Sequence, residues 1–65
     1  MDTDRLVYMA NQIARNFAAQ GDAKAAELTA QHIRDFWTSA MRAELARADP
    51  TVLSDIARSA LQRLG

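Results

Sequence analysis

Strong helix-breaking residues occur at only two places inside this sequence, and they divide it into three segments. The first place is Gly21-Asp22 and the second is Asp49-Pro50. Glycine permits backbone conformations that end a helix, and proline cannot continue one because it lacks the backbone N–H. The intervening segments are rich in Ala, Leu, Arg and Gln, and they show little apolar alternation. The sequence therefore predicts an all-α protein, a single helical domain over residues 1–65 built as a small bundle of three to four helices.

The first and last helices have recognisable ends. We expect the first over about residues 4–20, with Thr3 as its N-cap and Gly21 just beyond its C-terminus. The last is predicted over about residues 50–64, with Asp49 as N-cap and Pro50 at the first helical position. Each has an apolar stripe at helical spacing. In the first helix the stripe consists of Leu6, Ala10, Ile13 and Phe17, flanked by Met9 and Ala14.

The middle helix, predicted over about residues 23–37 after Asp22 as N-cap, has an unusually wide apolar face. Its polar residues crowd into an arc of roughly 100° when successive residues are placed 100° apart. An ordinary surface helix needs an apolar face only somewhat wider than about 100°. We therefore expect this helix to be covered on two sides, and one of those sides is attributed to a partner protein.

Thr38-Ser39 predicts a break in the middle helix, because both residues favour N-cap positions. A short third helix would then run over about residues 39–47. One continuous helix through Arg47 is the alternative.

Composition excludes several classes of function. The chain has no cysteine and one histidine, which leaves no thiolate and no histidine pair for a metal. Its formal net charge is zero, which argues against nucleic acid and against an anionic membrane surface. No apolar run approaches the roughly 20 residues of a membrane span, and the acidic start Met-Asp-Thr-Asp is unlike a secretory signal. We expect a cytoplasmic protein.

Catalysis by this chain is not expected. His32 is the only candidate histidine base, and its neighbours offer no orienting group. No Glu-x-x-His pair and no glycine-rich phosphate loop is present. His32 is interpreted as a residue at the edge of a packing face.

Docking on another protein is the function that the residues favour. Phe36 and Trp37 point about 100° apart on a helix, so either both belong to the core or one is inside and the other fills a partner's pocket. Large aromatic residues with Arg and Met are enriched at the centres of interfaces. A polar face on the first helix offers hydrogen-bonding groups as well. The predicted partner interface consists of Tyr8, Met9, Asn11, Gln12, Arg15, His32, Ile33, Arg34, Phe36, Trp37, Met41 and Arg42.

Three blocks of the sequence resemble one known family. The stretch Arg5-Leu-Val-Tyr-Met-Ala-Asn-Gln-Ile13 resembles the opening of the delta subunits of NAD-dependent molybdenum formate dehydrogenase. The stretch from His32 to Arg42 is similar to that family's second block, and Asp49-Pro50 to Leu64 is similar to its closing helix. One departure lies after Trp37, where the family often has Asp-Pro and this chain has Thr38-Ser39.

The resemblance implies a non-catalytic accessory subunit of a soluble complex that oxidises formate to carbon dioxide and reduces NAD. In that family the bis-molybdopterin-guanine-dinucleotide molybdenum site and most iron–sulfur clusters belong to the alpha subunit. The beta subunit holds FMN and NAD, and the gamma subunit holds a further cluster. The resemblance therefore implies no cofactor on this chain, direct docking on the alpha subunit, and a role in assembly or stability.

Two other hypotheses remain open from the sequence. A self-associating helical module would bury the same apolar face in a homodimer. A transient chaperone would help to insert the molybdenum cofactor and then leave the complex.

Overall fold

The computed structural model describes residues 2–64 of the 65-residue chain and contains only helices and turns over that range. The elements are α1 (Thr3–Phe17), the 3-10 turn η1 (Ala18–Gln20), α2 (Asp22–Phe36), α3 (Ser39–Ala46), the 3-10 turn η2 (Pro50–Val52) and α4 (Asp55–Leu64). The predicted all-α class is confirmed, and so is the break near Thr38.

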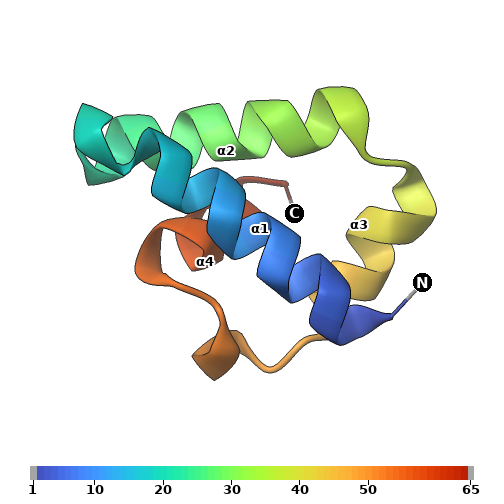
Figure 1. Cartoon of the computed structure of the whole chain (residues 1–65). Helices are drawn as coiled ribbons and strands as arrows, with labels where there is room; N and C mark the ends of the chain where they lie inside the picture. Colours follow the sequence, from blue (N-terminus) through green and yellow to red (C-terminus); the bar gives the residue numbers. More distant parts are fainter. Residues whose placement is uncertain (1, 65) are drawn as a thin grey trace.

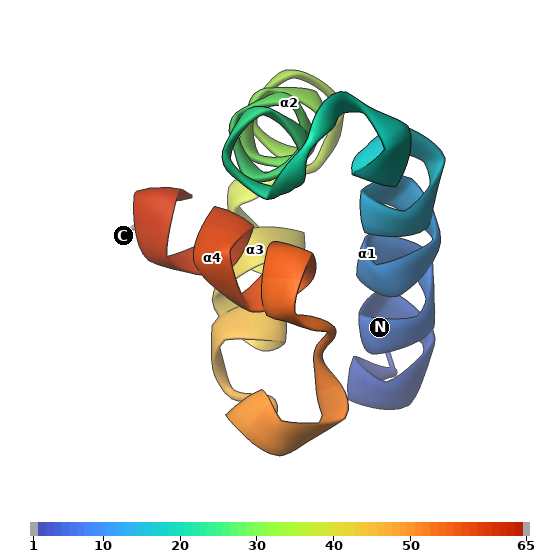
Figure 2. The same ribbon diagram turned by 90° about the vertical axis from the view of Figure 1, so that its left-hand side faces the viewer.

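Helix α2 makes the most extensive contacts in the bundle, and it packs against both α4 and α1. Figure 1 shows α1 crossing in front of α4 beneath α2, with α3 closing one end. Seen along α2, the helices α1 and α4 lie on two different sides below it (Figure 2). The wide apolar face of α2 is thus covered by two helices of its own chain. The attribution of one whole side of α2 to a partner protein is therefore corrected, although Phe36 on the same apolar face stays 73% exposed.

The start of α1 is capped by Asp2 rather than by the predicted Thr3. One carboxylate oxygen of Asp2 accepts a hydrogen bond from the backbone N–H of Asp4 at 3.1 Å. Thr3 is already helical, and its hydroxyl donates to the carboxylate of Glu44 on α3. This contact joins the first turn of α1 to α3.

Gly21 connects the two longest helices in a conformation that few other residues adopt. Its φ of 94° and ψ of 151° lie in a region that is essentially restricted to glycine. No atom outside its immediate neighbours lies within 4 Å of where a Cβ would be, so the backbone, not space, requires glycine here. Gly21 also occupies the N-cap position of α2, and the predicted N-cap Asp22 is the first helical residue.

The break between α2 and α3 turns on Trp37 and Thr38, whose backbones are both extended. Trp37 has φ −98° and ψ 145°, and its N–H still donates to the carbonyl of Ile33 at 2.9 Å. The Thr38 hydroxyl accepts from the N–H of Met41 at 3.1 Å and caps α3. The helix therefore ends between Phe36 and Trp37, which frees the two aromatic side chains to point to different places.

The last helix begins later than predicted. Asp49 and Pro50 do start a helical turn, but it is the short η2, in which the Asp49 carboxylate accepts from the N–H of Thr51 at 3.0 Å. Leu53 then runs extended, and Ser54 accepts from the N–H of Ala57 at 3.2 Å to begin α4. Two capping signals lie five residues apart, and the second one starts the longer helix.

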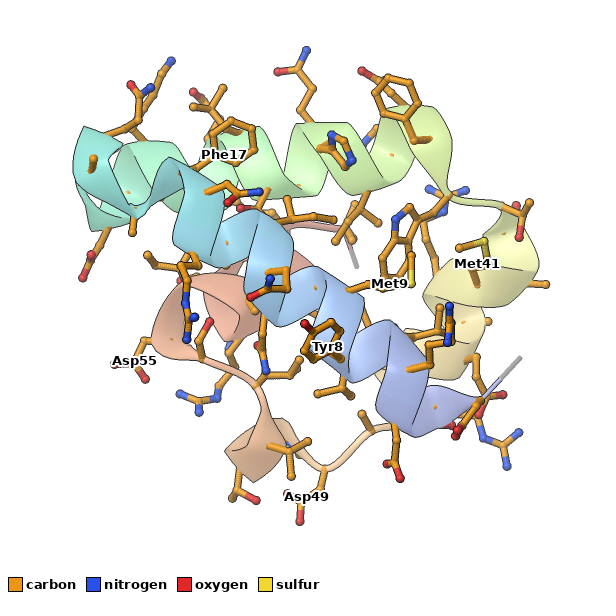
Figure 3. The ribbon with its side chains drawn as sticks, in the orientation of Figure 1. Tyr8, Met9, Phe17, Met41, Asp49 and Asp55 are labelled. Carbon is orange, nitrogen blue, oxygen red and sulfur yellow. The ribbon has the colours of Figure 1, made fainter. Side chains whose placement is uncertain are left out.

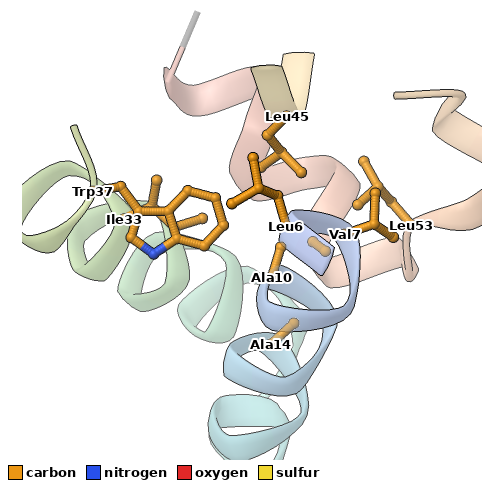
Figure 4. Packing of buried hydrophobic residues seen from close by; sticks show 9 residues of the cluster. Leu6, Val7, Ala10, Ala14, Ile33, Trp37, Leu45 and Leu53 are labelled. Carbon is orange, nitrogen blue, oxygen red and sulfur yellow. The ribbon is translucent and has the colours of Figure 1, made fainter. Parts of the chain in front are cut away.

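The core is formed where all four helices meet. Leu6, Ile33 and Leu45, from α1, α2 and α3, are each exposed by 1% or less. The indole of Trp37 is buried beside them, and Leu53 closes the core from the loop before α4 (Figure 4). Most of the buried side chains of α2 and α4 are alanines, which lets these two contacting helices approach closely. These alanines are Ala25, Ala26, Ala30, Ala57 and Ala60.

We predict that Trp37→Ala lowers the free energy of unfolding by about 3–5 kcal/mol, because it leaves a large cavity in the core. Phe36→Ala, one residue earlier, should change it by no more than about 0.5 kcal/mol, because that side chain is 73% exposed. Urea titrations followed by far-ultraviolet circular dichroism measure both values. Equal losses in the two variants would contradict the assignment of Trp37 alone to the core.

The cap at Asp49 predicts a pH dependence. The N–H of Thr51 holds the pKa of the Asp49 carboxyl below its ordinary value. The stability that this cap contributes is therefore present above the unfolded-state pKa of about 3.9, and it is lost as the pH falls through the lower folded-state pKa. In Asp49→Asn, which keeps an acceptor oxygen without a titrating charge, that part of the acid dependence should vanish. Thermal unfolding of both proteins from neutral to acidic pH tests this, and parallel curves would refute it.

Candidate docking surface

The residues predicted to contact a partner do not form one continuous surface. Ile33 and Trp37 lie in the core of the chain, with 1% and 7% of their surface exposed. Their assignment to a partner interface is corrected, because the turn after Phe36 directs the indole inward. The choice that the sequence left open is resolved, with Trp37 inside and Phe36 outside. The remaining predicted residues of α1, together with His32 and Phe36, fall into two groups on different sides of α1. Arg34 lies elsewhere on α2, and Met41 and Arg42 belong to α3.

The first group lies where α1 and α2 run side by side. Residues four apart form one row along a helix, and each of these two helices carries one such row beside the contact between them. We call these two rows the α1–α2 seam. Phe17 and Met9, at the two ends of the α1 row, both lie on the side of α1 that faces α2 (Figure 3). The seam consists of Met9, Ile13 and Phe17 on α1 and Leu28, His32 and Phe36 on α2.

The seam is apolar and incompletely covered. All of its residues except Phe36 are partly buried, and Phe36 is the most exposed large apolar side chain in the described range at 73%. The rings of His32 and Phe36 are tilted against each other with centroids 4.8 Å apart. His32 thus supports an exposed aromatic ring on one side of α2, which is a geometry suited to filling a partner's pocket.

The second group lies on α1 beside the loop that precedes α4. Its central residue, Asn11, already makes hydrogen bonds within the chain. The side-chain amide of Asn11 donates to the carbonyl of Val52 at 3.1 Å and accepts from the N–H of Ser54 at 2.9 Å. Asn11 was predicted to hydrogen-bond a partner, but it binds this loop. Arg58 holds the same loop from the other side, donating to the carbonyls of Pro50 and Leu53 at 3.0 and 2.9 Å.

Exposed side chains surround the loop. Tyr8 is 65% exposed and Val52 53%. A cleft of about 450 Å³ lies nearby, and its lining includes Arg15 and Ile56. Gln12, Arg15 and Arg34 are exposed as well, whereas Met41 packs partly buried against the core.

The predicted partner interface did not include three members of the seam, Ile13, Phe17 and Leu28. Phe17 was interpreted as part of the buried stripe of α1, and Leu28 as part of the wide arc of α2. Both are only partly buried in the structure. The spacing of Leu28, His32 and Phe36, each four positions after the one before, is the signal that could have grouped them.

The described part of the chain offers little for chemistry. Across residues 2–64, no group of three or more His, Asp or Glu side chains is placed to hold a metal ion. Within the same range, every helix is too short or too polar to cross a membrane. The surface that stands out is the α1–α2 seam.

Comparison with known proteins adds the decisive observation. The sequence model of the family of NADH-dependent formate dehydrogenase delta subunits, FdsD, matches residues 5–61. The chain belongs to this family. The matched range includes the whole seam and the loop held by Asn11. No curated protein and no solved structure matches the chain.

We predict that Asn11→Ala removes the support of the loop before α4. The exposed setting limits the loss to about 0.5–1.5 kcal/mol for each hydrogen bond. Amide hydrogen exchange followed by NMR should show faster exchange at the Ser54 N–H, while Asn11→Asp, which keeps that acceptor, should retain its protection. Asn16→Ala, an exposed asparagine on the same helix, is the matched control. Unchanged exchange at Ser54 in Asn11→Ala would show that the amide does not hold the loop.

Proposed function

We propose that this chain is a non-catalytic accessory subunit of a soluble, cytoplasmic NAD-dependent formate dehydrogenase complex. It docks on the molybdenum-containing alpha subunit through the α1–α2 seam and supports the assembly or stability of the complex. The beta and gamma subunits are its other neighbours in the complex. Molybdenum, iron–sulfur clusters, FMN and NAD are assigned to those other subunits, because this chain has no cysteine for a cluster and no glycine-rich loop for a dinucleotide.

Family membership supports the complex, and one structural observation supports the surface. Phe36 exposes 73% of its surface at the edge of an apolar row whose other members are partly buried. Its indole neighbour is buried, so this exposure does not result from a poorly formed helix end. An aromatic ring held out on a rigid helix loses little side-chain entropy when it enters a partner's pocket.

The size of the chain fits docking by one face. A standard interface covers about 800 Å² on each partner. That is about a fifth of the 4187 Å² of surface that this chain exposes. The bundle measures 29 × 23 × 18 Å, so a contact of standard size would occupy essentially the whole of one broad side. Because α2 is covered within the chain, docking requires only the seam and does not require a partner to complete the core.

The test is a binding titration of the folded chain against purified alpha subunit. We expect Phe36→Ala to weaken binding at least about tenfold, as for an aromatic hot spot. Tyr8→Ala is the matched control, since Tyr8 is also an exposed aromatic, at 65%, but lies on the side of α1 away from the seam. A loss confined to Tyr8→Ala would move the interface to the loop side of α1. An absence of binding by the unaltered chain would reject the proposal.

Two further measurements separate this proposal from the alternatives. Sedimentation of the isolated chain would reveal a tight homodimer if the seam served self-association. The composition of the purified active complex would show whether the chain remains bound, as a subunit does, or is absent, as a transient chaperone for cofactor insertion would be.

A further inference from the structure

A second partly apolar surface lies between α3 and α4. Figure 2 shows α1 on one side of the bundle and the C-terminal end of α4 on the other, with α3 behind it. The groove between α3 and α4 has a volume of about 390 Å³. Leu61 and Leu64 line it from α4 and remain only partly buried, while Ala43 and Ala46 on α3 leave room between the helices.

Arg42 gives this groove a charge. Arg42 lines the groove, and its Nε is shielded from solvent without a hydrogen-bond acceptor. One terminal nitrogen donates to the hydroxyl of Ser39, at a long 3.3 Å. The ion pairs among residues 2–64 are Lys24–Glu27 and Arg58–Asp55, and neither includes Arg42. A partly buried cation thus lies beside two leucines with no carboxylate opposite it in the described part of the chain.

We propose that this groove is a second docking site, which binds a partner segment that presents a carboxylate beside a large apolar side chain. The carboxylate pairs with the Arg42 guanidinium, whose planar fork of N–H donors matches two carboxylate oxygens. The apolar side chain packs on Leu61 and Leu64. A groove of about 390 Å³ has room for such side chains, because pockets of about 300–1,000 Å³ hold drug-sized ligands. The inference rests on the proposed function, since the segment belongs to a subunit of the formate dehydrogenase complex.

Charge complementarity favours this occupant over the others. An entirely apolar segment would fill the groove but leave the cation shielded and unpaired, which is unfavourable. A nucleic acid would need an excess of positive charge that the chain, with zero formal net charge, does not have. With the seam beside α1 and the groove beside the end of α4, the chain would contact two segments at once and hold them at a fixed separation.

The experiment uses the full chain and the formate dehydrogenase complex purified from cells that lack it. A photoreactive benzoylphenylalanine is placed either at Ala46, an exposed residue of the groove, or at Phe36 in the seam. We expect the Ala46 probe to cross-link to a subunit segment that contains Asp or Glu. We also expect Arg42→Gln to weaken binding to the complex at least about tenfold, and Arg42→Lys less, because lysine keeps the charge but loses the fork.

Arg47→Gln is the matched control, because Arg47 is an exposed arginine at the end of the same helix. Circular dichroism melts establish that each variant folds. Cross-linking from Phe36 alone, with Arg42→Gln binding normally, would overturn the groove and leave the proposed function standing. A product with a second copy of the chain, or with a segment without acidic residues, would also overturn it. No binding by the unaltered chain would reject both proposals.

Discussion

The turn at Trp37 and Thr38 is the constraint on which the rest of the structure depends. Two extended residues end α2, return the indole to the core and let the Thr38 hydroxyl start α3. If the helix had continued, α3 would project away from the bundle and Leu45 could not reach the other helices. The burial of Trp37, Leu45 and Leu6 in one cluster is thus a consequence of two backbone conformations.

The loop of residues 50–54 is the irregular segment of this chain. The sequence has no cysteine for a disulfide, and the described residues include no cluster of metal ligands that could hold this loop. Here side chains from two helices hold it. Asn11 binds the loop from α1, and Arg58 binds it from α4 while pairing with Asp55. Together they satisfy backbone groups of residues 50–54, which regular structure leaves without partners. Leu53 is thereby kept in the core although it lies outside any helix.

The sequence predicted the architecture well and the surface less well. Helix-forming composition and the few breakers were sufficient for the class and for the break at Thr38, because these depend on local preferences. Thr3 was misplaced as a cap by one position because the adjacent Asp2 competes for the same role. Asp22 was misplaced by one position because the backbone conformation of Gly21 places the start of α2 directly after the glycine. The start of α4 was missed because Ser54 and Asp49 both resemble an N-cap, and only the hydrogen bonds of Asn11 and Arg58 favour the short turn first. The hydrogen bonds of Asn11 join residues about 40 positions apart in the sequence, and no local sequence pattern reveals them.

The wide apolar face of α2 was correctly interpreted as a sign that this helix is covered on two sides. The element that covers the second side is α4 of the same chain. Alanine explains the difference. The buried residues of α4 are Ala57 and Ala60, so this short helix of ten residues can approach α2 closely enough to cover that side. Large side chains were therefore not needed on that side of α2.

The adjacency of Phe36 and Trp37 has a thermodynamic consequence. One residue projects outward from the last turn of α2, and the next is anchored among the core side chains. Any molecule that immobilises the outer ring also suppresses fraying of that turn, and so favours the closed arrangement of the indole. By thermodynamic linkage, binding of a partner at Phe36 and packing of Trp37 in the core stabilise each other by the same free energy. A contact on the surface of this chain of 65 residues can in this way stabilise its core without reaching it.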